Sequence, residues 1–400
     1  MADLKTSFCG IKAPNPFWLS SSSVSNTAEM VIRAFEEGWG GAVFKSLSLN
    51  EEVRLHNTSP CFAAIGFEDK NFLGLENIEL FSERPFSENL IDLKEIKKRF
   101  PDRALIASLA VTPKKEECQE LAIKVQKTGV DGLELNFSCP NVKTGGGAGR
   151  SIGKNPELVA RIIGWIKEVS KVPVLAKLTA SITDIRKMAV VAKEAGADGI
   201  SAINTIPSII GVDLETLIPK PTVDGKTAIG GYSGPAIKPI ALRCVAEIAM
   251  DKEIGLPISG IGGITTWQDA AEFILLGSTS VQVTTAIMRY GYRIVEDLID
   301  GLSNWMDEKG IKKLDDMVGK SLSYFTNVES LNRNYKMVST IDKKACVKCG
   351  LCYIVCQDAG QQAITLDENK FPIIDKEKCG GCSLCSLICP VMDCIVMKTV

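Results

Sequence analysis

The residues best suited to chemistry are cysteines, and most of them crowd into one end of this 400-residue chain. Nine of the fourteen cysteines lie within residues 339–400, whereas the whole chain contains a single histidine, His56. In a reducing compartment, such crowding indicates metal or redox chemistry rather than disulfide bonds. Because one histidine offers little for acid–base catalysis, we expect any proton transfer to depend on another side chain.

Eight of these cysteines form an internal repeat. Two runs with the spacing C-x₂-C-x₂-C-x₃-C lie 33 positions apart, and the Ile-Asp-Lys at 341–343 recurs at 374–376 with the same offset. This is the spacing of bacterial-type ferredoxins with two [4Fe–4S] clusters, in which the fourth cysteine of each run binds the other cluster. We therefore predict one cluster on Cys346, Cys349, Cys352 and Cys389, and a second on Cys379, Cys382, Cys385 and Cys356.

Two Cys₄ zinc sites are the alternative for this repeat. Zinc sites usually pair two C-x₂-C hairpins across a longer spacer, whereas three ligands strung along one loop are typical of an iron–sulfur cluster. One departure from the ferredoxin pattern is Gln357, which follows Cys356 where a proline is common. It changes no ligand, so the prediction of iron–sulfur clusters stands.

A second candidate for chemistry is Cys139, in the sequence Asn-Phe-Ser-Cys-Pro at 136–140. It follows a strand-like run and precedes a glycine-rich segment, residues 143–149, of the kind that can close over a substrate. A thiol with a pKa of about 8.5 can exchange a proton at neutral pH. The alternative is a small buried cysteine that packs as an apolar side chain. The position of Cys139 beyond a strand favours the catalytic interpretation.

Residues 1–305 alternate between strand-like and helix-like segments. Strands are expected at residues 17–21, 42–45, 105–108, 133–136, 174–177, 199–204, 257–260 and 281–284. Helices are expected at residues 27–37, 115–127, 156–169, 182–195, 238–250, 267–275 and 289–305. Eight such units in about 300 residues favour a closed (β/α)₈ TIM barrel. We predict an α/β fold with three parts, namely the barrel in 1–305, a linker in 306–338 and a ferredoxin domain in 339–400.

Most of the predicted strands end in polar residues, which in a barrel meet on the catalytic face. These residues are Ser21, Lys45, Ser108, Asn136, Lys177, Asn204, Thr284 and Thr285. Each alone could simply begin a loop, but buried lysines and asparagines are costly unless they are paired. Together they predict a polar pocket that binds an anion or a heterocycle.

Glycine-rich segments suggest which ligand occupies the pocket. Residues 259–264 follow the seventh strand and precede a helix that begins near residue 265, and residues 284–285 follow the eighth strand. In such barrels, the loops after these two strands and a helix N-terminus form the common phosphate site. Residues 230–234 could add backbone N–H groups, although tight turns alone would also explain these glycines. Because no G-x-G-x-x-G motif opens a strand–helix unit, FMN suits the pocket better than a nicotinamide dinucleotide.

Composition excludes several classes of protein. The chain is 45% hydrophobic and 24% charged with a net charge of −2, so it lacks the basic footprint of a nucleic-acid-binding protein. No apolar run approaches the ~18 residues that span a bilayer, and residues 1–7 lack the apolar core of a signal peptide. We expect a cytoplasmic protein that binds neither nucleic acid nor membrane.

A flavin barrel joined to a two-cluster ferredoxin indicates an electron-transfer enzyme. Essentially the whole chain resembles the FMN and iron–sulfur subunit of bacterial NAD-dependent dihydropyrimidine dehydrogenases and the corresponding part of the animal enzymes. Besides the cysteine runs, the resemblance is carried by residues 77–79, 136–140, 176–179, 203–205 and 231–234. It implies that FMN contacts Ser21, Lys45, Ser46, Asn136, Lys177, Gly234, Ile261, Gly262, Gly263, Thr284 and Thr285. It implies that the pyrimidine is held by Asn77, Asn136, Phe137, Ser138, Asn204 and Thr205.

The reaction implied by the resemblance is the reduction of uracil or thymine to a 5,6-dihydropyrimidine, a step of pyrimidine catabolism. Hydride from the flavin would reach C6, and Cys139 would donate the proton to C5. Asparagine amides carry a donor and an acceptor each, which matches the N–H and C=O edge of these rings. Electrons would arrive through both clusters from a partner subunit that binds FAD and NAD(P)H, in a heterotetramer.

Two alternatives stay open at this point. The Pro-Asn-Val-Lys at 140–143 is closer to class 1 dihydroorotate dehydrogenases, but the stretch that holds the orotate carboxylate in those enzymes is replaced here by Asn-Ile-Glu at 77–79. The other alternative is an electron-carrier module with a vestigial barrel. Such a carrier has no need for Cys139 beside Asn136 and Asn204.

Overall fold

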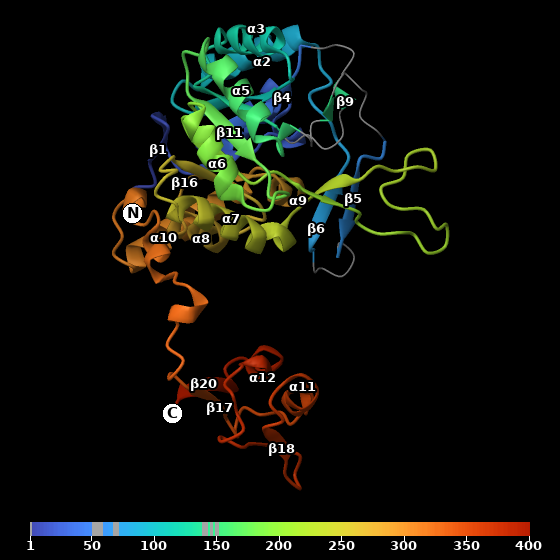
Figure 1. Ribbon diagram of the computed structural model, residues 1–400, viewed down its shortest axis with the longest axis vertical. Helices are drawn as coiled ribbons and strands as arrows, with labels where there is room; N and C mark the ends of the chain where they lie inside the picture. The colour runs from blue at the N-terminus through green and yellow to red at the C-terminus, as the bar shows by residue number, and fades with distance from the viewer. Residues whose placement is uncertain (1, 50–58, 67–71, 138–142, 145–146, 149–151) are drawn as a thin grey trace. The chain divides into compact units, whose positions relative to one another are not determined.

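Eight parallel strands close into a barrel in the computed structural model, which describes residues 2–49, 59–66, 72–137, 143–144, 147–148 and 152–400. The chain divides into two units, Met1–Tyr324 and Phe325–Val400, and the barrel belongs to the first. In chain order its strands are β3 (Phe17–Leu19), β4 (Gly41–Leu47), β7 (Ala104–Ala110), β8 (Gly132–Asn136), β11 (Val174–Leu178), β12 (Gly199–Ala202), β15 (Ile258–Ile261) and β16 (Ser278–Val283). Each strand pairs with the next, and β16 pairs with β3. Figure 1 shows helices around these strands. The predicted (β/α)₈ barrel is confirmed.

The barrel strands are apolar runs that are buried on both faces. All seven residues of β4 and all seven of β7 are buried. A strand covered on both faces needs apolar side chains throughout, which is why the sequence shows continuous runs rather than alternation. Glu134 in β8 and Gln282 in β16 are polar exceptions, and both take part in the site described below.

The helices of this unit pack their apolar faces on the barrel. They are α1 (Ala28–Glu37), α2 (Phe86–Arg99), α3 (Lys115–Gln126), α5 (Pro156–Lys167), α6 (Ile185–Glu194), α7 (Lys238–Met250), α8 (Trp267–Leu275), α9 (Thr285–Tyr290) and α10 (Ile294–Glu308). Local signals define their ends. At the start of α1, Met30 N donates to Thr27 Oγ1 at 3.2 Å, and Gly38 ends the helix with a φ of 112°. No described helix is long and apolar enough to cross a membrane.

The helical layer differs from expectation in two places. Helix α2 was not expected, because its buried face mixes the polar Asn89 and Asp92 with Leu93 and Ile96, which obscures the apolar period. The helix expected at 289–305 is interrupted between α9 and α10. Gly291 lies at this break with a φ of 78°, a conformation that glycine adopts without strain.

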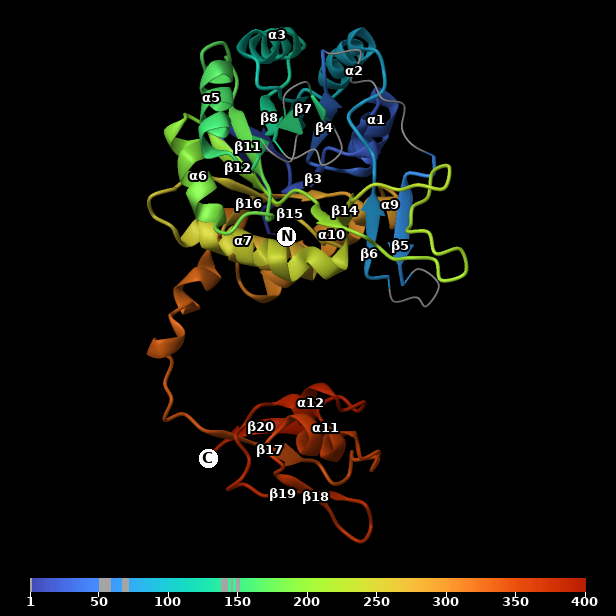
Figure 2. The ribbon, with the colours of Figure 1, turned by 45° about the vertical axis from the view of Figure 1, so that its right-hand side comes forward.

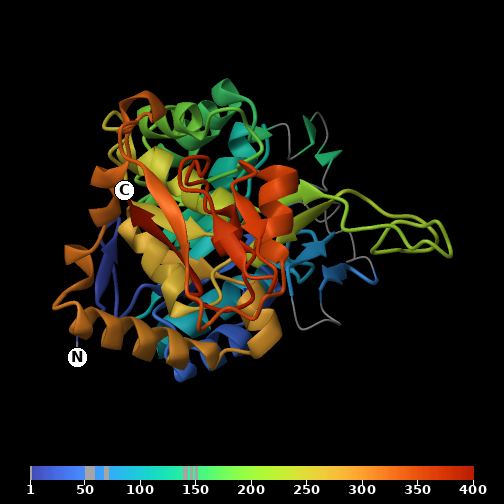
Figure 3. The same cartoon turned by 90° about the horizontal axis from the view of Figure 1, so that it is seen from below.

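A second, antiparallel sheet lies beside the barrel, and the sequence did not predict it. Its order is β13 (Ile206–Ser208), β14 (Gly230–Ser233), β6 (Gly74–Asn77) and β5 (Phe62–Ile65), and β5, β6 and β14 lie together in Figure 2. Between β13 and β14 the chain projects as a long loop (Figure 3). Strands of three or four residues that pair across long separations leave little trace in a sequence. This sheet matters because β6 carries Asn77 to the open end of the barrel.

An N-terminal hairpin closes the opposite end of the barrel. Strands β1 (Thr6–Phe8) and β2 (Ile11–Ala13) pair antiparallel and bury Phe8 and Ile11. These two side chains cluster with residues near the beginnings of four barrel strands, namely Trp18, Val43, Ile106 and Leu175. The end at which the strands finish is therefore the one left for a site.

The second unit is a small duplicated structure. Strand β17 (Met337–Ile341) pairs antiparallel with β20 (Ile395–Thr399), and β18 (Ile364–Leu366) pairs with β19 (Pro372–Ile374). Its helices are α11 (Leu351–Ala359) and α12 (Leu384–Leu387). Five of the nine residues in its buried core are cysteines. Since so small a unit has little conventional core, its stability must depend on what those thiols bind.

A substitution of Asp92 tests how α1 and α2 are joined. Its Oδ2 accepts a hydrogen bond from the buried Ala28 N at 2.9 Å, and its carboxylate also contacts Arg84. We expect Asp92→Ala to lower the free energy of unfolding by about 1–3 kcal/mol, because a buried N–H loses its acceptor. All five tryptophans lie in the first unit, so urea unfolding followed by tryptophan fluorescence reports on the barrel.

The matched control is Glu36→Ala, which removes an exposed carboxylate paired with Arg99 at 2.9 Å. An exposed ion pair contributes little, so this change should cost less than about 1 kcal/mol. Equal costs for the two variants would contradict the role assigned to Asp92.

Candidate active site

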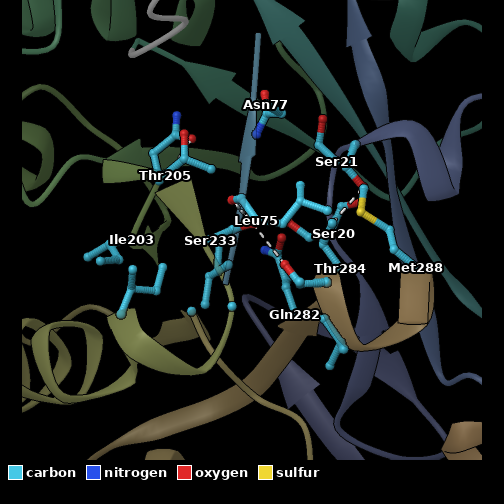
Figure 4. A pocket seen from close by; sticks show the side chains of 18 of the residues that line it. Ser20, Ser21, Leu75, Asn77, Ile203, Thr205, Ser233, Gln282, Thr284 and Met288 are labelled. Atoms are coloured by element: carbon cyan, nitrogen blue, oxygen red, sulfur yellow. Dashed lines mark hydrogen bonds between the residues drawn. The ribbon is translucent and has the colours of Figure 1, made fainter. Parts of the chain in front are cut away.

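A cavity opens where the barrel strands end, with a volume of about 1030 Å³ including its open mouth. Side chains from several elements face it: in Figure 4, Ser20 and Ser21 follow β3, Asn77 ends β6, and Thr205 lies across the space from them. Residues that are distant in the sequence therefore share one polar enclosure.

Two lysines line this cavity, and each is paired with a carboxylate. Lys45, on β4, donates to Glu79 Oε1 at 3.0 Å, and Lys177 Nζ, on β11, lies 3.2 Å from Glu134 Oε1. Only 3% of Lys45 and 4% of Lys177 are exposed. Because an unpaired buried charge is costly, the two carboxylates offset the cost of burying the lysine side chains.

Beneath Lys177, a polar layer crosses the barrel interior. The Nε2 of Gln282 donates to Glu134 Oε2 at 3.0 Å and lies within 3.3 Å of the hydroxyls of Ser201 and Ser259. Among the described residues, Gln282 Oε1 is a buried acceptor with no hydrogen-bond partner. Since Gln282 also lines the cavity, this acceptor suits a ligand that brings an N–H group.

A chain of hydrogen bonds fixes two asparagine amides in the cavity wall. Asn204 Nδ2 donates to Asn136 Oδ1 at 3.1 Å, and Asn136 Nδ2 donates to Ser46 Oγ at 3.1 Å. On the other side of Asn204, Thr205 N donates to its Oδ1 at 2.9 Å. These contacts decide which way each amide presents its oxygen and its nitrogen.

A third amide comes from the antiparallel sheet. Asn77 is the last residue of β6, and its Nδ2 donates to Gly231 O of β14 at 3.1 Å. This bond orients the side chain while its oxygen remains an acceptor at the cavity wall. Three asparagines from three different elements thus line one cavity.

Glycines bring two loops of the cavity wall into backbone contact. Gly234 and Gly263 have φ values of 105° and 77°, which other residues rarely adopt. A Cβ on Gly263 would lie 2.9 Å from Gly234 O and 2.8 Å from Lys238 Cβ, and a Cβ on Gly234 would lie 2.8 Å from Gly74 Cα. The space beside these glycines is a cradle that backbone N–H groups can line, as phosphate sites require.

The N-terminus of α8 is closed by its own residues. Asp269 Oδ2 accepts hydrogen bonds from Thr265 N and Thr266 N at 2.8 Å, and Lys238 donates to Oδ1 at 2.6 Å. Burial alone would raise the pKa of Asp269, but these hydrogen bonds hold it below its ordinary value. The N–H groups of Thr265 and Thr266, which precede the helix, are therefore taken by a carboxylate, and a role of this helix N-terminus in binding phosphate stays a prediction.

The C-terminal unit holds two smaller cavities lined by cysteines. One, of about 330 Å³, is lined by Cys346, Cys349, Cys352, Cys389 and also Cys394. The other, of about 340 Å³, is lined by Cys356, Cys379, Cys382 and Cys385. Each contains three cysteines from one run and the fourth cysteine of the other run. A thiol set of this kind suits iron–sulfur chemistry, because thiolates are the ligands of such clusters.

Comparison with known proteins shows where the chain belongs. The model of the dihydroorotate dehydrogenase family matches residues 3–306, which is most of the chain. The chain belongs to the dihydroorotate dehydrogenase family. The 4Fe-4S dicluster domain matches residues 339–397, so this family barrel is joined to an iron–sulfur domain.

The relatives of this chain are named either as dihydropyrimidine dehydrogenases or as dihydroorotate dehydrogenases. The chain is 46% identical over 367 residues to the NAD-dependent dihydropyrimidine dehydrogenase subunit PreA of Escherichia coli, covering 92% of this chain and 88% of the relative. It is 40% identical to the chloroplastic dihydropyrimidine dehydrogenase (NADP⁺) of Arabidopsis thaliana, covering 87% of this chain and 83% of the relative. It is 37% identical to the dihydroorotate dehydrogenase B (NAD⁺) catalytic subunit of Pyrococcus abyssi, covering 80% of this chain and 99% of the relative.

Solved structures support the family fold. The dihydroorotate dehydrogenase of Eimeria tenella, solved in complex with ferulenol, superposes with a TM-score of 0.66. The match covers 80% of this chain and 88% of that one, at 21% sequence identity. At this identity the match is evidence for the barrel fold alone. It agrees with the strand order described above.

The cavity gathers most of the residues that the family resemblance assigns to ligands. All eleven expected FMN contacts line it, as do four expected pyrimidine contacts, namely Asn77, Asn136, Asn204 and Thr205. Phe137 is instead packed in the hydrophobic core. Ser138 and Cys139 lie outside the described residues, and the described parts of the glycine-rich segment, 143–144 and 147–148, pair as two short antiparallel strands.

Sequence reasoning missed three polar residues of this site. Glu134 and Gln282 interrupt the apolar runs of β8 and β16, and a charge or an amide within a buried strand is a signal that was available. Glu79 was noted for its place in the Asn-Ile-Glu segment but received no role. Its pairing with Lys45 depends on the antiparallel sheet, which the sequence did not predict.

A substitution of Gly263 tests whether the glycine cradle binds the cofactor. We expect Gly263→Ala to lose bound flavin, because the new Cβ would collide with Gly234 O and Lys238 in a backbone conformation that alanine resists. The flavin released from the denatured protein, measured by its fluorescence, gives the effect.

Gly277→Ala is the matched control. Gly277 also has a positive φ, 108°, and a Cβ there would lie 2.5 Å from Ala249 Cβ, but this glycine does not line the cavity. It should lose stability and keep the flavin. If both variants retain flavin equally, the cradle does not hold the cofactor.

Proposed function

We propose that this chain is the catalytic subunit of a dihydropyrimidine dehydrogenase, which reduces uracil or thymine to the 5,6-dihydropyrimidine. The observation that carries the proposal is the set of three asparagines, Asn77, Asn136 and Asn204, around one cavity that also holds two paired lysines and a glycine cradle. The names of the E. coli and Arabidopsis relatives support it.

The asparagines and Thr205 would hold the pyrimidine by its amide groups. Uracil and thymine present alternating N–H donors and C=O acceptors along one edge, and a primary amide can match both. Because the amides of Asn136 and Asn204 are held in one orientation by neighbouring hydrogen bonds, the ring would be bound in a single pose. The resemblance also assigns Phe137 and Ser138 to the pyrimidine, but the Phe137 side chain is packed in the core, so Ser138 alone is kept as a further proposed contact.

The residues of the cavity suit FMN, which supplies the hydride for such a reduction when it is bound. The loops at Gly234 and at 261–263, with Thr284 and Thr285, would hold its phosphate. Lys45, Lys177, Ser21, Ser46 and Asn136 would contact the remainder. The unpartnered Gln282 Oε1 fits this assignment, because a flavin ring brings a polar edge that includes an N–H group.

Cys139 would hold the proton that the pyrimidine receives at C5. It follows Asn136 by three residues, and Asn136 lines the cavity at the end of β8, so the chain leaves the barrel at the site itself. In the reducing direction the thiol form is the active one, since it must donate. Binding of the substrate beside this thiol would also exclude water from the proton transfer.

The C-terminal unit would carry two [4Fe–4S] clusters, which pass single electrons when they are bound. Cys346, Cys349, Cys352 and Cys389 would ligate one cluster. Cys379, Cys382, Cys385 and Cys356 would ligate the other. We propose that a partner subunit with FAD and an NAD(P)H site loads these clusters within a heterotetramer, in line with the E. coli relative being named a subunit.

Dihydroorotate oxidation is the second candidate, favoured by the names of the Pyrococcus relatives. Orotate carries a carboxylate at C6, which needs a cationic partner when it is buried. Among the described residues that line the cavity, Lys45 and Lys177 are the cations, and both already have carboxylate partners. An uncharged pyrimidine therefore suits the cavity better. An electron-carrier role leaves the three asparagines unexplained.

Metal analysis tests the cluster assignment. The anaerobically purified chain should contain about eight iron and eight acid-labile sulfide. Cys356→Ser should remove about half of both, because the fourth ligand of the cluster on Cys379, Cys382 and Cys385 is lost.

Cys394→Ser is the matched control, since Cys394 is buried at the other cysteine cavity but belongs to neither proposed set. It should keep the full iron content. Zinc in place of iron would overturn the assignment.

Cys139→Ala tests the reaction. The variant should keep FMN and both clusters but lose about 10²–10⁴ in the rate at which uracil reoxidises the reduced protein in a single turnover. In the wild type this rate should fall as pH rises through the pKa of the thiol, ordinarily about 8.5, because the thiolate cannot donate a proton.

Cys118→Ala is the control, because Cys118 is buried on α3, where its thiol donates to Thr112 O at 3.1 Å. It should leave the rate unchanged. Equal rates for wild type and Cys139→Ala would remove Cys139 from the mechanism. Failure of both uracil and thymine to reoxidise the wild type would overturn the proposed function.

A further inference from the structure

We infer that Glu79 makes the site selective for uncharged pyrimidines over pyrimidines that carry a carboxylate. The inference rests on the proposed function and adds a specificity-determining residue to it. It follows from where the Glu79 carboxylate lies, from what it is paired with, and from the charges of the other side chains in the cavity wall.

Glu79 is held at the cavity by the antiparallel sheet. It lies two residues beyond Asn77, and the segment between them is anchored by Ile78, whose N–H donates to Cys61 O at 3.0 Å and whose side chain is buried. The Glu79 side chain is 11% exposed and lines the same cavity as Asn77 and Asn204. A pyrimidine held by those amides would therefore lie close to a fixed carboxylate.

The charges of the cavity wall leave an anionic substrate without a partner. The cationic side chains among its described residues are Lys45 and Lys177, which lie 3.0 Å and 3.2 Å from the carboxylates of Glu79 and Glu134. The phosphate of FMN would add further negative charge to the same cavity. A carboxylated pyrimidine would thus meet the Glu79 carboxylate with no cation left free to pair with its own charge, whereas uracil and thymine bring no charge.

The expected size of this effect is large. Two like charges about 5 Å apart at an effective dielectric constant of about 20 repel each other enough to weaken binding on the order of a hundredfold, and the attraction by the paired Lys45 lowers this to about tenfold. Replacing Glu79 by glutamine removes that repulsion and also frees Lys45 to attract a carboxylate. Both changes favour the anionic pyrimidine.

Pairing with a lysine does not by itself explain Glu79, as the second pair shows. Glu134 partners Lys177 in the same way, but it is fully buried and does not line the cavity. If Glu79 served only to neutralise Lys45, the two carboxylates would be equivalent. The size of the shift in preference between uracil and orotate distinguishes pairing from repulsion, because loss of either carboxylate frees a lysine but loss of Glu79 also removes a like charge from the cavity wall.

The experiment titrates uracil and orotate into the oxidised holoprotein and reads each Kd from the perturbed flavin absorption. In the wild type uracil should bind more tightly than orotate. Glu79→Gln should shift the ratio of the two Kd values toward orotate by about tenfold or more, and Glu79→Asp, which keeps the charge, should retain the wild-type preference. Glu134→Gln also frees a lysine of the wall but removes no carboxylate from it, so its shift toward orotate should be clearly smaller than that of Glu79→Gln, and equal shifts would overturn the role of Glu79.

A second measurement needs no variant. Orotate methyl ester is larger than orotate but uncharged, so the wild type should bind the ester at least about tenfold more tightly than the acid. If size excluded orotate, the ester would bind no better than the acid. An unchanged ratio in Glu79→Gln, or an ester as weak as the acid, overturns the inference and leaves the proposed function standing. A wild type that prefers orotate overturns both.

Discussion

Two lysine ammonium groups are buried inside the barrel, and much of the surrounding structure serves to pair them with carboxylates. Lys45 and Lys177 are almost completely buried, and a charge taken out of water is tolerated only beside an opposite charge. The barrel provides one partner itself, since Glu134 lies on β8 next to β11. For Lys45 the partner is Glu79, which follows β6 of the antiparallel sheet. That sheet is thus tied to the barrel by electrostatics as well as by packing.

The same requirement organises the polar residues around the lysines. Glu134 is held by Gln282, and Gln282 in turn contacts serines on β12 and β15, so the interior of the barrel is crossed by hydrogen bonds where apolar side chains would be usual. Removing one member of such a layer leaves the others buried without partners. A lysine that is rigidly held in this way can keep one position while a ligand enters and leaves the cavity.

The sequence predicted the barrel because its determinants are local: apolar runs such as β4 and β7 and helices with clear ends such as α1 can be recognised one segment at a time. It also predicted that the lysines and asparagines at strand ends would meet, since barrel closure brings those ends together. It did not predict the partners of the lysines. Glu79 depends on pairing between short, distant strands, and α2 was hidden by the polar residues on its buried face. The place of Cys139 beside a pyrimidine stays a prediction.

The antiparallel sheet also has a consequence for how the protein is made. Asn77 is oriented by Gly231, 154 positions further along the chain, so the wall that carries it cannot be completed until β14 has been synthesised. Contacts between such distant segments form late, because a long loop must close first. A ribosome-bound chain that has emerged only through β12 therefore displays strand edges and an unfinished, charged cavity. In that interval the nascent polypeptide is exposed to misassembly, and the hazard ends when the last two barrel strands, β15 and β16, have been added.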